Sequence, residues 1–277
     1  MSTPLLVMIL LGILAACLIL LRAGMGRRLK KGAWQGFEAG ACKTIGSRQI
    51  QGDAYGIVQN EDSVMAVLAG GMGNGYGAKA ASRIVVEVFE DMFQDRNAFY
   101  NPQYSFRRAF HAANKKILDH LDGERGAASV TAVMIKNRKL YYASVGNVKL
   151  AVCRNGELVP ITSGHTISML ARQKYREGKL TRQSALSLLE QYRLYNYVGQ
   201  DGFRDIEFFD TPVALCGGEY VALLSNGMCE GVSWRKLEEC LEGEGSCQEK
   251  ALRMVELVNG RIEEDVDNAS VVVVKVG

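Results

Sequence analysis

A glycine-rich turn at residues 70–77 is the first candidate for chemistry in this sequence. It follows an apolar strand predicted at 64–69 and precedes a helical apolar pattern, and its Gly75-x-Gly77-x-x-Ala80 spacing fits a dinucleotide-binding turn. That fold needs a second parallel strand ending in an acid about 20 residues later, where a helix is predicted instead. The sequence also contains no Gly-Lys-Ser/Thr, so a P-loop is excluded and a Rossmann fold is disfavoured.

Histidine and cysteine chemistry is not indicated either. His111 and His120 share a predicted helix, His165 stands apart, and no Ser-His-Asp or Cys-His pair is recognisable. The seven cysteines are odd in number and form no Cys-x-x-Cys pair, so neither a zinc site nor a disulfide framework is predicted. We expect buried or free thiols in a reducing compartment.

The elements that must position any site are strands in groups and helices in pairs. Apolar periodicity predicts strands and helices, and Asn155-Gly156 indicates a type I′ hairpin turn. This pattern favours an α+β fold with two antiparallel sheets and helices outside. The predicted strands are 53–58, 64–69, 129–135, 140–145, 148–154, 220–224 and 270–276, and the helices lie at 81–92, 106–121, 166–191 (broken near Gly178) and from 246 onward.

The N-terminus carries a membrane signal. Residues 4–21 are uncharged and nearly all apolar, and 18 residues of helix span about 27 Å, close to the thickness of a bilayer core. A basic cluster at 22–31 follows, which favours an uncleaved single-pass anchor with the C-terminal domain in the cytoplasm over a cleaved signal peptide. We therefore expect a cell-membrane protein with a transmembrane anchor at 1–22, a basic juxtamembrane linker at 23–42 and one domain at 43–277.

Five segments of this domain, in chain order, resemble the signature motifs of the PP2C-type (PPM) protein phosphatases. A sixth, Thr-Ser-Gly-His at 162–165, echoes their T-x-D-H motif. The resemblance covers residues 43–277 and implies a β-sandwich of two antiparallel sheets flanked by pairs of antiparallel helices. The five segments are RQIQGD at 48–53, AGGMGN at 69–74, SVGNVK at 144–149, SNGM at 225–228 and DNAS at 267–270.

The resemblance implies a centre of two divalent cations that activate a water molecule. Two dications about 4 Å apart repel each other by roughly 16 kcal/mol at an effective dielectric constant near 20, so several anionic oxygen ligands are needed. Asp53, Gly71 and Asp267 are the residual candidates for metal binding here. The positions where this chain departs from the family pattern are Gly70, Asn147, Gly164 and Asn226.

Arg48 matches the arginine that receives the substrate phosphate in this family. A guanidinium group binds phosphate through two parallel hydrogen bonds and needs no metal for it. Phosphate binding can therefore persist without hydrolysis. The alternative is that Arg48 forms an ordinary surface salt bridge.

These observations predict a membrane-anchored PP2C-like pseudophosphatase that binds or scaffolds a phosphoprotein or a protein kinase without hydrolysing it. We expect no cofactor, and no nucleic acid partner because the net charge is only +3. The alternative is a divergent but active serine/threonine phosphatase that uses Mn²⁺ or Mg²⁺. A third interpretation is a structural membrane subunit with a vestigial phosphate site.

Overall fold

The computed structural model describes residues 36–73, 75–95, 97–121, 126–191, 193–203, 205–261 and 265–277. The chain divides into Met1–Gln35 and Gly36–Gly277, and the second unit is the one described here. The predicted anchor at 1–22 and most of the predicted linker at 23–42 lie outside the described residues. Within the described ranges, no helix is both long enough and apolar enough to cross a bilayer.

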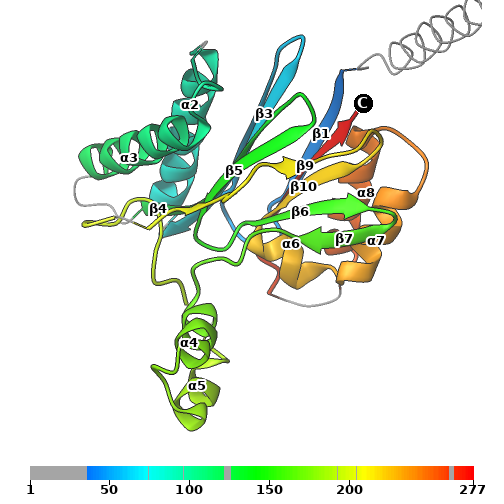
Figure 1. The fold of residues 1–277 in the computed structure, drawn as a ribbon. Helices are drawn as coiled ribbons and strands as arrows, with labels where there is room; N and C mark the ends of the chain where they lie inside the picture. The colour runs from blue at the N-terminus through cyan, green and yellow to red at the C-terminus, as the bar shows by residue number, and fades with distance from the viewer. Residues whose placement is uncertain are drawn as a thin grey trace, which may run out of the picture. The chain divides into compact units, whose positions relative to one another are not determined.

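Two antiparallel sheets form the centre of this unit (Figure 1). One sheet has the order β1-β11-β10-β6-β7; the other has the order β2-β3-β4-β5-β8, with β9 also paired to β5. The first sheet consists of β1 (Phe37–Thr44), β11 (Ala269–Val276), β10 (Tyr220–Leu224), β6 (Lys149–Arg154) and β7 (Glu157–Pro160). The second consists of β2 (Ala54–Gln59), β3 (Ser63–Gly73), β4 (Gly126–Lys136), β5 (Lys139–Val145), β8 (Glu207–Phe208) and β9 (Val213–Ala214).

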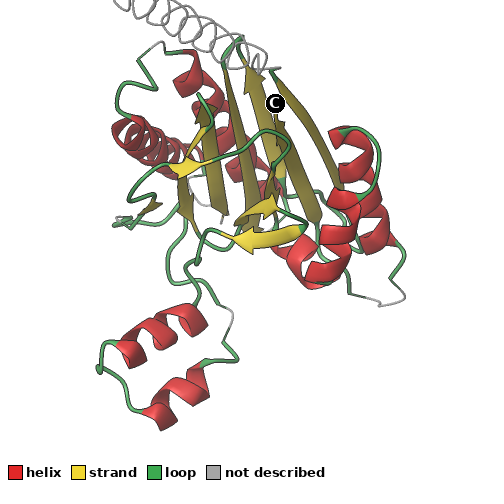
Figure 2. Cartoon of the chain, turned by 45° about the vertical axis from the view of Figure 1, so that its right-hand side comes forward, coloured by secondary structure: helices red, strands yellow, loops and turns green. Residues whose placement is uncertain are grey.

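Helices cover the outer face of each sheet. Helices α2 (Tyr76–Gln94) and α3 (Pro102–His120) pack on the second sheet, and α6 (Asn226–Gly231), α7 (Trp234–Glu242) and α8 (Cys247–Asn259) pack on the first. Two further helices, α4 (Ile167–Arg176) and α5 (Arg182–Leu188), form a hairpin that projects away from both sheets (Figure 2).

The apolar pattern explains these layers. Strand β3 is buried on both faces from Ser63 to Ala69, because one face meets the other sheet and the other face meets α2. Helix α2 buries Ala81, Val85 and Phe89, which recur at a spacing of four residues and so lie on one side of the helix. Helix α8 begins with a capping box, in which Ser246 and Glu249 satisfy each other's backbone amides.

The predicted α+β architecture of two antiparallel sheets with outer helices is confirmed, as are the break near Gly178 and the left-handed Asn155-Gly156 turn. The compact unit begins at Gly36, earlier than the expected boundary at 43. Residues 37–42 of the expected linker belong to β1, which pairs with β11 along its whole length. This segment consists largely of small residues, so its apolar pattern is weak. Pairing with the valine-rich strand β11 therefore determines β1 more than its own sequence pattern does.

Candidate functional site

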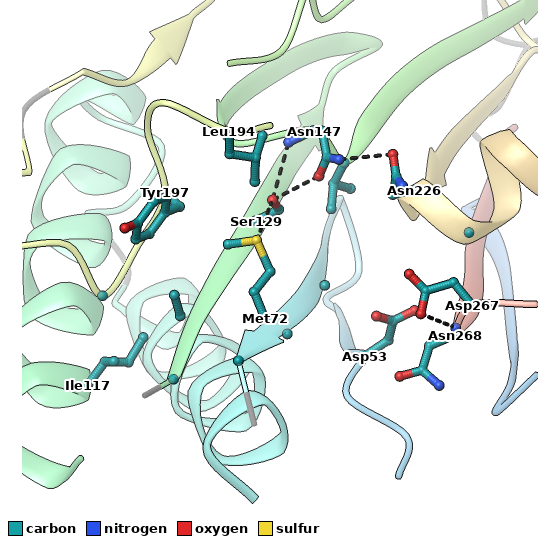
Figure 3. A pocket seen from close by; sticks show the side chains of 18 of the residues that line it. Asp53, Met72, Ile117, Ser129, Asn147, Leu194, Tyr197, Asn226, Asp267 and Asn268 are labelled. Atoms are coloured by element: carbon teal, nitrogen blue, oxygen red, sulfur yellow. Dashed lines mark hydrogen bonds between the residues drawn. The ribbon is translucent and has the colours of Figure 1, made fainter. Parts of the chain in front are cut away.

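The candidate site lies at one edge of the sandwich, where several strands of both sheets begin or end. Asp53 directly precedes β2, Gly70 lies near the end of β3, and Asn147 follows β5. Asn226 opens α6 after β10, and Asp267 precedes β11. Antiparallel pairing brings these chain ends to the same edge, and all five residues line one cavity of about 660 Å³ (Figure 3).

Asp53 lies at the floor of this cavity and is 6% exposed. Its Oδ2 accepts a hydrogen bond from the hydroxyl group of Ser270 at 2.7 Å. Burial raises the pKa of Asp53 to about 6, although the hydroxyl groups of Ser270 and Ser225 favour the ionised form. The carboxylate is therefore stabilised mainly by neutral donors.

The upper wall of the cavity is a chain of neutral polar groups. The hydroxyl group of Ser129 donates to Oδ1 of Asn147 at 2.9 Å, and Nδ2 of Asn147 donates to Oδ1 of Asn226 at 2.9 Å. Ser129 lies directly opposite Gly70 in the pairing of β3 with β4, so these hydrogen-bonded polar groups begin next to the glycine. The two amides thus hydrogen-bond to each other and carry no net charge.

Gly70 and Gly71 are adjacent but have different surroundings. A Cβ atom built on Gly70 would lie 3.6 Å from Oδ1 of Asp53 and 3.8 Å from Val148, which are ordinary contacts. A Cβ atom on Gly71 would overlap the backbone carbonyl groups of Ala78 and Gly52. Gly71 is therefore required by packing, whereas a Cβ atom at position 70 would fit in ordinary van der Waals contact with Asp53.

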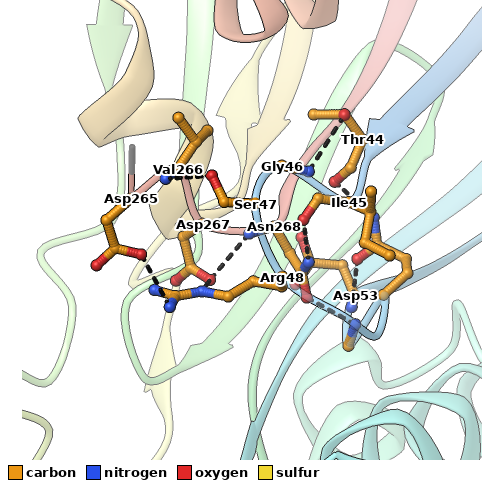
Figure 4. Close-up of polar contacts among 12 residues, drawn as sticks. Thr44, Ile45, Gly46, Ser47, Arg48, Asp53, Asp265, Val266, Asp267 and Asn268 are labelled. Carbon is orange, nitrogen blue, oxygen red and sulfur yellow. Dashed lines mark hydrogen bonds and ion pairs between the residues drawn. The ribbon is translucent and has the colours of Figure 1, made fainter. Parts of the chain in front are cut away.

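Arg48 forms ion pairs with two carboxylates at the rim, those of Asp267 and Asp265 (Figure 4). Nε of Arg48 lies 3.0 Å from Oδ1 of Asp267, and one of its terminal nitrogens lies 2.9 Å from Oδ1 of Asp265. The Arg48 side chain is 46% exposed and lines a neighbouring hollow rather than the main cavity.

Gly164, like Arg48, is an expected site residue that does not line the main cavity. It adopts a left-handed conformation with φ of 86°, and its amide group donates to Oε2 of Glu207 at 3.2 Å. The neighbouring His165 accepts a hydrogen bond from the amide of Gly146 through Nδ1 at 2.9 Å. His165 thus holds the loop that carries Asn147 through its hydrogen bond with Gly146.

Sequence reasoning missed the apolar side of the cavity and Ser129. Met72, Ile117, Leu194 and Tyr197 line the side of the cavity that lies away from Asp53, Asn226 and Asp267 (Figure 3). These side chains come from β3, α3 and the chain after the hairpin, so no local motif unites them. Ser129 had one available signal, because it begins a predicted strand that pairs with the strand leading to Gly70.

Comparisons with known proteins agree with this geometry. No protein-family model matches the chain. It is 24% identical over 202 residues to the probable protein phosphatase 2C 39 of Arabidopsis thaliana, a match that covers 68% of each chain. Its fold matches the serine/threonine phosphatase of S. agalactiae with a TM-score of 0.74 at 22% identity, covering 87% of this chain and all of the other. The chain is therefore similar in sequence and in fold to PP2C-type protein phosphatases.

A further PP2C-type structure bears on metal binding. The catalytic domain of the phosphatase PstP, solved in complex with two manganese ions, matches this chain with a TM-score of 0.67 and 22% identity over 87% of its length. Within the described residues of this chain, no group of three or more His, Cys, Asp or Glu side chains is arranged to hold a metal ion. Asp53 and Asp267 are the two carboxylates among the residues that line the cavity.

Proposed function

We propose that this PP2C-like protein is a pseudophosphatase, which binds a phosphorylated partner or a protein kinase and does not hydrolyse phosphate. The observation that carries the proposal is the state of its two cavity carboxylates. Asp53 is buried against the hydroxyl group of Ser270, and Asp267 is paired with Arg48. Neutral amides at Asn147 and Asn226 and a glycine at position 70 supply no further negative charge. Too little negative charge faces the cavity to offset the repulsion between two dications.

Phosphate recognition by Arg48 is part of the proposal. Its partners Asp265 and Asp267 have side chains that are 79% and 46% exposed, and exposed ion pairs contribute about 0–1 kcal/mol each. A phosphate group carries nearly two negative charges and offers three acceptor oxygens, so it can displace Asp265 from the guanidinium group. In this interpretation Asp265 holds the arginine in place until a phosphorylated side chain arrives.

The proposed place of action is the membrane. The apolar run at 4–21 and the basic cluster at 22–31 support a single-pass anchor with the PP2C-like domain in the cytoplasm. A phospho-binding domain held there would keep its partner close to the bilayer. This part of the proposal rests on the sequence pattern alone.

A phosphothreonine peptide titration of the full chain, held in neutral detergent with Mg²⁺ or Mn²⁺, tests this function. We expect binding without release of inorganic phosphate, weaker binding by Arg48→Gln, and binding up to about fivefold tighter by Asp265→Asn, which removes a competing carboxylate. The unphosphorylated peptide is the control for the ligand, and Arg83→Gln, which removes an exposed arginine from α2, is the control for charge. Metal-dependent phosphate release would overturn the proposal, as would equal affinity for the two peptides.

A further inference from the structure

The α4–α5 hairpin projects from the sandwich and is joined to it by two neighbouring loop segments (Figure 2). The amide of Ile167 donates to the carbonyl of Arg193 at 2.8 Å, and the amide of Tyr195 donates to the carbonyl of His165 at 3.0 Å. Each helix begins at a threonine whose side chain caps it. No other described helix or strand packs closely against the pair, so both helices present their surfaces to solvent.

The hairpin is strongly basic, and much of its charge is not neutralised. Residues 166–193 contain six basic and two acidic residues. Glu177 lies 3.4 Å from Lys174 and 2.8 Å from Lys179, so one carboxylate serves both lysines. Arg172 and Arg182 have no ion pair among the described residues, although both are exposed. The unsatisfied cations are thus arginines, whose planar guanidinium groups suit carboxylates.

A hollow of about 180 Å³ lies between the two helices, with these two arginines on its rim. Its lining is otherwise mostly apolar, and two of its large side chains are well exposed, Tyr175 at 48% and Leu186 at 55%. The volume is sufficient for one aliphatic or aromatic side chain. The lining residues are Arg172, Tyr175, Arg182, Ala185, Leu186 and Leu189.

We propose that the α4–α5 hairpin is a docking surface for an acidic segment of a partner protein. The segment inserts one apolar side chain between the helices and places carboxylates against Arg172 and Arg182. Charge complementarity selects the partner, and burial of the apolar side chain contributes the non-polar part of the affinity. This surface does not involve Arg48 or the cavity, so it acts independently of the phosphate site.

The concave shape favours a protein segment over an anionic bilayer. A peripheral helix binds a bilayer with a continuous apolar face inserted among the acyl chains. Here the exposed apolar groups surround a recess that accepts a single side chain, and the charged groups sit directly on its edges. A discrete side chain with flanking acids matches that arrangement.

An array of twelve-residue peptides, each with a central Leu, Phe, Ile or Met, provides the test with the full chain in neutral detergent. One set flanks the apolar residue with glutamates and the other with glutamines. We expect fluorescence anisotropy to report binding of glutamate peptides that weakens as salt rises, and little binding of glutamine peptides. Arg172→Gln/Arg182→Gln lowers this affinity by about fivefold or more, and Leu186→Ala also weakens it.

The matched control is Arg83→Gln/Lys115→Gln, which removes two exposed positive charges from α2 and α3 and should leave peptide affinity unchanged. Circular dichroism of each variant shows that the fold is retained. Three results would overturn the proposal: equal loss of affinity in the control, binding to phosphatidylserine vesicles without binding to glutamate peptides, or self-association of the chain that Arg172→Gln/Arg182→Gln abolishes.

Discussion

Asp53 is a buried acid whose hydrogen-bonding partners are neutral hydroxyl groups. Because burial raises the pKa of this carboxyl group to about 6, the folded protein prefers the protonated form relative to the unfolded chain. As pH rises from about 4 to about 6, the unfolded chain loses its proton first, so the free energy of unfolding falls. At neutral pH an ionised Asp53 therefore destabilises the domain when no cation is bound beside it.

Asp53→Asn should stabilise the protein at pH 7 by on the order of 2 kcal/mol, because the amide keeps an acceptor for Ser270 and carries no charge. The advantage should shrink below pH 6 and vanish near pH 4, where the wild-type carboxyl group is also neutral. Urea denaturation at a series of pH values measures this difference. A variant less stable than wild type at pH 7 would show that the carboxylate is favourably paired.

The end of β3 shows how an element constrains neighbouring residues differently. Gly71 lies where β3 passes close to the chain at Gly52 and to helix α2 at Ala78, so no side chain fits. Gly70 lines the cavity, and a Cβ atom at this position would make only ordinary van der Waals contacts. The glycine at 70 is therefore not imposed by packing.

Gly71→Ala should destabilise the domain by about 2 kcal/mol or more, because its methyl group meets backbone atoms on two sides that cannot rotate away. Gly70→Ala should change stability by about 0.5 kcal/mol or less. Thermal denaturation followed by circular dichroism compares the two variants directly. Similar losses in both would contradict the difference in surroundings.

The sequence predicted the long elements with clear periodicity and missed elements that depend on tertiary pairing. Strands β3 to β6 and helices α2, α3 and α8 carry strong local patterns. Strand β1 and the short strands β7, β8 and β9 do not, because each is held by one neighbour. Helix α6 spans six residues, too few for a clear apolar period, and the nine-residue helix α7 was not predicted.

Part of the site followed from sequence motifs, because each motif lies at the end of a strand. Asp53, Asn147, Asn226 and Asp267 were expected to meet and do line one cavity. The hydrogen bond between the two asparagines and the ion pairs of Arg48 depend on side-chain directions, which spacing does not specify. The Arg48 salt bridge, the alternative considered from the sequence, is present in the structure, and its role with phosphate stays a prediction.

At the scale of the whole molecule, two separate surfaces are proposed to bind partners. The sandwich edge has a cavity lined by two carboxylates, and the projecting hairpin offers a basic, partly apolar surface. We propose that both surfaces bind partners, as expected for a protein that holds partners together. The distinction between binding and catalysis then depends on whether the sandwich edge can hold metal.

Calorimetric titration of the full chain with Mn²⁺, beside the double variant Gly70→Asp/Asn226→Asp, tests this most directly. A Cβ atom at position 70 makes only ordinary van der Waals contacts, and the variant adds two carboxylates to the residues that line the cavity. The account predicts no Mn²⁺ uptake at micromolar concentrations by the natural sequence, and uptake by the variant. Two Mn²⁺ ions bound per natural chain with micromolar affinity, and lost in Asp267→Ala, would contradict it.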